Sequence, residues 1–256
     1  MKKLFIGCGI LVVLILGVVG WAAYQVYPDA TQGQEQMATA FAQLKELDQA
    51  HPFEADAQTQ LDGPRFVQVL QIRVDQAKYL RGIVEDLGSL AEEFEDGEEP
   101  GWIESFRLLL RAMKQSFLFM GEASTKFAER LATAQMGPSE FAWHTKVLWA
   151  CLRRVDQGAG EPGLEDLRGR FDEFREFYKE QKDANDKLPV LDELIGDVPS
   201  SVIAQASVIL ATDVERVKDG LYAPQFDHLY LLLPAHELED LELMVEPDGA
   251  EAPAGR

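Results

Sequence analysis

Apolar residues recur every three or four positions along most of this chain, which is the spacing of one face of an α-helix. The two longest patterns cover residues 64–95 and 102–134, and each predicts an amphipathic helix. An acidic loop that contains Gly97 and Pro100 separates them. No segment alternates convincingly with period two, so the pattern favours an all-α fold.

Shorter helices are predicted over residues 34–50, 139–156, 164–187 and 200–220. Several begin or end at residues that suit a helix terminus, and Pro64 stands where a missing N–H group costs nothing. At Met136-Gly137-Pro138-Ser139 we expect Gly137 to take the left-handed conformation that ends a helix, and Ser139 to cap the next one. The stretch 226–233 is apolar and fits either a short helix or a strand.

The N-terminal segment is of a different kind, since Leu4–Ala23 contains no charged residue and has Leu14 and Leu16 near its middle. At a rise of about 1.5 Å per residue, such a helix covers roughly 30 Å, the thickness of the hydrocarbon core. The predicted fold is therefore an N-terminal transmembrane helix followed by a bundle of about five or six helices, two of them long.

The charges beside this segment predict its orientation. Lys2 and Lys3 precede it, whereas acidic Asp29 and Glu35 follow, so the positive-inside rule leaves the N-terminus in the cytoplasm. The body is then expected to lie outside the cytoplasm, on the periplasmic side of the membrane. A cleaved signal peptide is the alternative, because Gly20-Trp21-Ala22 offers small residues at suitable spacing, but the apolar run is longer than usual for one.

Three regions follow from these patterns. Residues 1–28 are predicted to form a membrane anchor or uncleaved signal, residues 29–245 an acidic helical domain, and residues 246–256 a disordered tail rich in Pro, Ala and Gly.

Composition narrows the range of partners. The chain has 44 acidic and 24 basic side chains and a formal net charge of -20, which repels nucleic acid. Two cysteines, Cys8 and Cys151, leave the body with one thiol and no internal disulfide. The apolar neighbours of Cys151 predict a buried, unreactive side chain.

Recognisable catalytic chemistry is absent from the sequence, which has no dinucleotide or P-loop glycine motif, no HExxH, no CxxC and no GxSxG. His144 is expected to be a hydrogen-bonded histidine in the core or at its boundary, and the spacing of His228 and His236 matches no standard metal site. Accordingly, we assign no catalytic residue, metal or cofactor.

The helix predicted over 102–134 carries more apolar residues than one partner helix covers. Crowded apolar residues on it suggest a partner-binding surface that includes Phe117, Phe119 and Met120, with Phe119 as the member expected to be most exposed. The alternative is that the other helices bury this strip completely.

Two segments, Asp62–Arg73 and Met136–Trp143, carry a resemblance to known proteins. The first is Asp-Gly-Pro-Arg-Phe-Val-Gln-Val-Leu-Gln-Ile-Arg, and the second is Met-Gly-Pro-Ser-Glu-Phe-Ala-Trp. They are similar to a group of uncharacterised, N-terminally anchored or exported helical bacterial proteins, with Phe141 in place of that group's tyrosine. This resemblance implies a helical envelope protein and brings no activity with it.

Together these patterns predict a membrane-anchored, non-enzymatic protein that binds another protein or an apolar ligand in the cell envelope. The alternative is a membrane-tethered hydrolase whose carboxylates carry no recognisable motif.

Overall fold

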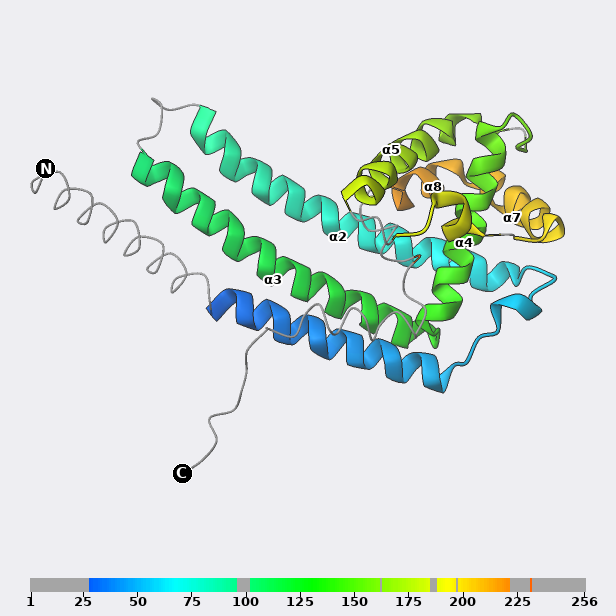
Figure 1. Cartoon of the computed structure of the whole chain (residues 1–256), viewed down its shortest axis with the longest axis horizontal. Coiled ribbons are helices and arrows are strands. Elements are labelled where there is room, and N and C mark those ends of the chain that lie inside the picture. Colours follow the sequence, from blue (N-terminus) through cyan, green and yellow to red (C-terminus); the bar gives the residue numbers. More distant parts are fainter. Residues whose placement is uncertain are drawn as a thin grey trace, which may run out of the picture. The chain divides into compact units, whose positions relative to one another are not determined.

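The computed structural model describes residues 28–95, 102–161, 163–184, 188–196, 198–221 and 231 (Figure 1). Every regular element in this part of the chain is an α-helix or a 3-10 helix, and it contains no strand. The predicted all-α fold class is therefore confirmed.

The first helix includes residues 28–50. The later elements, in chain order, are η1 (Ala55–Ala57), α2 (Gly63–Glu95), α3 (Trp102–Ala134), α4 (Pro138–Asp156), η2 (Glu165–Leu167), α5 (Arg168–Ala184), α6 (Leu191–Ile195), α7 (Ser200–Thr212) and α8 (Val214–Gly220). The two helices predicted to be long are α2 and α3, each of 33 residues.

The chain divides into two compact units. Unit 1 comprises Ile83–Thr125 with the chain up to Thr39, and unit 2 comprises Ala40–Gly82 with the chain from Lys126 onward. Both α2 and α3 contribute to each unit.

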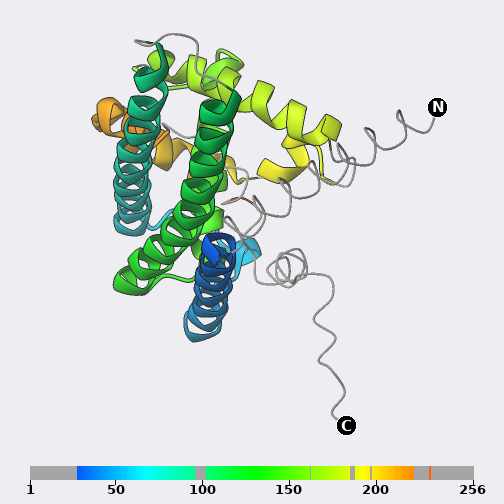
Figure 2. The same cartoon turned by 90° about the vertical axis from the view of Figure 1, so that its left-hand side faces the viewer.

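In unit 1, residues 28–39 lie beside α3, as both Figure 1 and Figure 2 show. Asp29 pairs with Lys114 at 3.0 Å, and one turn further Gly33 lies against Gly121. A Cβ atom on Gly121 would stand 2.7 Å from the carbonyl oxygen of Gly33 and 2.5 Å from Oε1 of Gln36. The glycine thus lets the two helices approach closely, and they run parallel.

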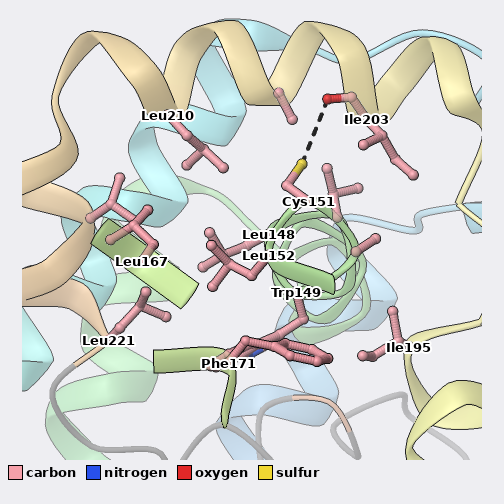
Figure 3. Close-up of a cluster of buried hydrophobic side chains, with 14 of the residues drawn as sticks. Leu148, Trp149, Cys151, Leu152, Leu167, Phe171, Ile195, Ile203, Leu210 and Leu221 are labelled. Carbon is pink, nitrogen blue, oxygen red and sulfur yellow. Dashed lines mark hydrogen bonds between the residues drawn. The ribbon is translucent and has the colours of Figure 1, made fainter. Parts of the chain in front are cut away.

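Unit 2 is organised around α4, of whose 19 residues 14 are buried. This helix contacts α5, α6, α7, η1 and η2. Figure 3 shows Leu148, Trp149, Cys151 and Leu152 projecting from α4 into the surrounding apolar side chains. The indole of Trp149 stacks on the ring of Phe174, with centroids 4.1 Å apart. An almost fully buried helix is held by the hydrophobic effect on all sides.

A second apolar cluster of unit 2 joins the end of the first helix to α2, α3 and the start of α4. Its buried members include Leu44, Ile72, Leu131 and Phe141. In this cluster Phe127 meets Phe141 edge-to-face at 5.0 Å. The stripe of apolar residues predicted along each helix is the stripe that packs here.

The junction between α3 and α4 differs from the predicted one. Gln135, not Gly137, has the positive φ of 51°, and the amide of Met136 donates to the carbonyl of Leu131 as in a Schellman motif. Gly137 is itself the N-cap of α4 with φ -74°, and a Cβ there would lie 2.8 Å from Oδ1 of Asp48. Glycine is required at this position by close approach rather than by backbone conformation.

Ser139 does not cap α4 as predicted, because Pro138 already occupies the first helical position. The amide and hydroxyl of Ser139 instead donate to the carboxylate of Asp48, both at 3.0 Å. Asp48 therefore ties the end of the first helix to the start of α4 and satisfies a free helix N–H group.

The single helix predicted over 200–220 is two helices. The backbone breaks at Asp213, with φ -150° and ψ 64°, and the side chain of Asp213 accepts from the amide of Arg216. Asp213 thus caps α8, and the capping conformation of its backbone replaces a continuation of α7. The region between Pro189 and Pro199, predicted as turns, contains the short helix α6.

Several predictions concern residues outside the described ones. These are the span Leu4–Ala23, the tail 246–256, and residues 226–233 apart from Leu231, which is helical and buried. Among the described residues, none of the helices combines the length and apolar content that a membrane crossing requires.

Candidate functional site

An ion pair of unit 2 joins α2 to α4 through several hydrogen bonds. Nε and Nη2 of Arg65 donate to Oε1 and Oε2 of Glu140, each at 2.7 Å. The side chains are only 27% and 11% exposed, so this bidentate pair is shielded from water far more than an ordinary surface pair. The hydrogen bond with Glu140 raises the pKa of Arg65 above its usual value.

The same guanidinium also closes the end of α3. It donates from Nη1 to the carbonyl oxygen of Ala134 at 2.8 Å and from Nη2 to that of Gln135 at 2.9 Å. Nη1 additionally donates to Oε1 of Gln68. A cation at a helix C-terminus satisfies carbonyl groups and interacts favourably with the helix dipole. Every donor atom of Arg65 is therefore engaged within the protein.

His144 lies one turn after Glu140 on α4 and is 1% exposed. Its ring packs against Trp143, Phe66 and Phe53, with centroids 4.8, 5.9 and 6.4 Å away. Burial lowers the pKa of His144 to about 4, although the negative charge of Asp62 acts in the opposite direction. The predicted burial of His144 is confirmed, but Nδ1 of its ring forms no hydrogen bond with a described residue.

Cys151 is fully buried, as predicted, and its thiol donates to the carbonyl oxygen of Ile203 at 3.6 Å (Figure 3). Burial raises the pKa of this thiol to about 11. Because the thiolate is the nucleophilic form, the raised pKa and the burial of Cys151 both disfavour its reaction in the folded protein.

A groove opens beside Arg65, between α2 and the last two turns of α3. Its volume is about 340 Å³, and its lining residues are Gln68, Gln71, Ile72, Asp75, Glu129, Arg130, Thr133 and Ala134. Gln68 and Ala134 also bind Arg65, which therefore marks one end of the groove. Grooves of this size hold a side chain or a small ligand.

The predicted partner-binding residues lie on α3 in unit 1. Met120 is 39% exposed, one of the four large apolar side chains that are exposed in the described part of the chain. Phe119 is half-buried and less exposed than Met120. The side chain of Phe117 lies outside the described ones.

Sequence reasoning did not find the groove or the Arg65–Glu140 pair. The pair joins residues 75 positions apart. The two walls of the groove come from segments that are separated in the sequence by the rest of α2 and most of α3. Arg65 and Glu140 lie in different segments of the chain, and nothing in the local sequence of either segment indicates that they meet.

Ligand chemistry is limited by the residues present. Among the described residues, no group of three or more histidine, cysteine or acidic side chains is placed to hold a metal ion.

Comparison with known proteins finds no matching family, no similar curated protein and no similar solved structure.

Proposed function

We propose that this chain is a single-pass membrane protein whose acidic helical body lies outside the cytoplasm and binds another protein without catalysing a reaction. Its place in the cell envelope rests on the sequence, through the uncharged run Leu4–Ala23 and the lysines before it. The resemblance of Asp62–Arg73 and Met136–Trp143 to exported helical proteins supports the same location.

The groove between α2 and α3 is the structural feature that supports the proposed binding of a partner. It is open, it lies on two helices fixed by a packed apolar cluster, and its rim ends at a rigid ion pair. Sites on such rigid elements are already arranged for a partner, which reduces the entropic cost of association.

Glu140 and His144 are placed for structure rather than for acid–base catalysis. A general acid or base needs a group that is free to exchange a proton with a substrate. Both oxygens of Glu140 instead accept hydrogen bonds from Arg65, and His144 is buried among aromatic rings. Glu140 and His144 therefore stabilise the fold rather than act on a substrate.

Topology is tested first. A reporter enzyme that is active only outside the cytoplasm, fused after Arg256, is expected to be active, whereas a reporter active only in the cytoplasm is expected to be silent. The reverse pair of results would place the body in the cytoplasm and refute the proposed location.

Binding is tested by photo-crosslinking in intact cells. A photo-reactive amino acid at Gln71, an exposed residue of the groove, is expected to give one discrete crosslinked protein. The matched control places it at Glu176, an exposed residue of α5. Equal crosslinking at the two positions, or none at Gln71, would argue against a partner at the groove.

A further inference from the structure

The two helices that form the groove run antiparallel, and the groove has one acidic end and one neutral end. Arg65 on α2 meets Ala134 on α3, whereas Asp75 and Gln76 meet Arg130, which is nearer the start of α3. Asp75 and Glu129 therefore stand at the same level on opposite walls. Gln68, Gln71 and Thr133 lie toward the other end.

The cation in this groove is already bound by the protein. One guanidinium nitrogen of Arg130 donates to Oε1 of Gln76, which is 3% exposed, and the other donates to the backbone carbonyl of Asp75 at 3.3 Å. These bonds hold the guanidinium of Arg130 against α2.

The two carboxylates lack a comparable partner. Asp75 accepts one hydrogen bond, from the side-chain amide of Gln71 at 2.9 Å, and forms no ion pair with a described residue. The carboxylate of Glu129 is exposed, and within the described part of the chain it has neither an ion pair nor a hydrogen bond. With Asp75, Glu129 and Arg130 counted together, the groove carries one net negative charge.

Apolar groups also line the groove. Ile72 and Ala134 belong to the buried apolar cluster, with 6% and 7% of their surface exposed, and both line the groove. A ligand that fits this arrangement has an alkyl stem to cover Ile72 and a cationic tip to reach Asp75 and Glu129. Lysine and arginine side chains have this construction.

We infer that the groove between α2 and α3 binds a lysine or arginine side chain presented by a basic segment of the partner protein. This inference rests on the proposed function for the partner being a protein, and it adds the chemistry of the segment that is bound. The net charge of -20 acts in the same direction, since it attracts a basic segment from a distance and speeds its association.

The test uses the full chain in micelles of a non-ionic detergent. The probe is a fluorescent peptide of alanines with three spaced lysines, and its control has norleucine in place of each lysine, which keeps the alkyl stem and removes the charge. Binding is followed by fluorescence anisotropy at low and at moderate salt, because surface ion pairs weaken as salt rises.

Two variants separate the groove from the general negative charge. The double substitution Asp75→Asn with Glu129→Gln keeps the shape of both side chains and is expected to raise the Kd of the lysine peptide about fivefold to tenfold, as expected for two partly exposed ion pairs. The matched control, Glu176→Gln with Glu180→Gln, removes the same charge from exposed positions on α5 and is expected to change the Kd less than about twofold.

Equal weakening by the two double variants would show attraction by net charge alone and overturn the inference. Equal binding of the lysine and norleucine peptides, or no binding of the lysine peptide, would overturn it as well. Because the peptide assay depends neither on the orientation of the chain in a membrane nor on the natural partner, the topology reporter and the crosslinking at Gln71 can succeed or fail independently of it. Equal denaturation midpoints for all variants exclude loss of folding as the cause.

Discussion

The guanidinium of Arg65 holds the carboxylate of Glu140 through two parallel hydrogen bonds of 2.7 Å, and so fixes the start of α4 to the first turn of α2. Because the same guanidinium binds the last carbonyl groups of α3, one side chain joins three helices.

Replacing Glu140 by Gln tests this junction. The change leaves a partly buried guanidinium without its counter-charge, so the free energy of unfolding is expected to fall by about 2–3 kcal/mol. Urea denaturation of the fragment that begins at Asp29 measures this loss. Glu173→Gln, in the exposed pair with Arg170, is expected to cost less than about 0.5 kcal/mol. Similar costs for both would show that the Arg65–Glu140 pair is no stronger than a surface pair.

Two glycine substitutions are expected to have opposite effects. Gly137→Ala forces a Cβ atom against Asp48 and the carbonyl oxygen of His51, at 2.8 and 3.0 Å, and is expected to cost about 1–3 kcal/mol. Gly82→Ala, inside α2, meets nothing within 4 Å and is expected to stabilise the protein by about 0.5–1 kcal/mol. Thermal unfolding of both variants measures the difference, and a harmless Gly137→Ala would refute the close approach.

Acid is expected to destabilise the fold through His144. Its pKa is lowered to about 4 when folded, whereas that of an unfolded histidine is about 6.5, so the unfolded state binds the extra proton between these values. Stability is therefore full above pH 6.5 and falls as pH decreases toward 4, by about 3 kcal/mol for a shift of this size. The charged side chains near this histidine are those of Asp62, Glu140 and Arg65, and the variant that tests His144 alters none of them.

His144→Asn removes the titrating ring, so its denaturation midpoint is expected to depend less on pH over this interval than that of the wild type. Identical pH dependence in the two proteins would mean that His144 is accessible to protons in the folded state.

The membrane anchor is tested by Leu14→Arg together with Leu16→Arg. Two arginines near the middle of a span are expected to cost about 5–7 kcal/mol of insertion free energy and to release the chain from the membrane fraction. Unchanged membrane fractionation after carbonate extraction would show that Leu4–Ala23 is not the attachment.

Substitutions of Met120 and Phe119 are expected to differ in their effect on stability, although the two residues are neighbours on α3. Met120→Ser changes an exposed side chain and is expected to alter the unfolding free energy by less than about 1 kcal/mol. Phe119→Ser removes a half-buried ring and is expected to cost more, about 1–2 kcal/mol. Urea denaturation compares them, and loss of partner capture by stable Met120→Ser would add this residue to the binding surface.

The long helices were predictable because α2 and α3 repeat apolar residues at helical spacing over many turns, and acidic and Gly-Pro segments separate them. The break at Asp213 was not, since Leu210, Val214 and Val217 continue the apolar spacing across it. Five-residue α6 is too short for any periodicity.

The groove was beyond sequence reasoning for a different reason. Its acidic end depends on Asp75 facing Glu129, and that pairing follows from how two distant helices pack rather than from local spacing. Similarly, the left-handed residue is Gln135 because the Schellman hydrogen bonds form two residues earlier than Gly137 suggested.

The burial of Cys151 makes this protein convenient for site-specific labelling. In the fragment that begins at Asp29 it is the sole cysteine, and its protonated, enclosed thiol is expected not to react with maleimides while the fold is intact. A cysteine introduced at Gln71 or Glu176 therefore takes a spin label or fluorophore without removal of the native residue. Conversely, labelling of Cys151 itself reports unfolding, so one reagent measures both ligand contact and the integrity of the core.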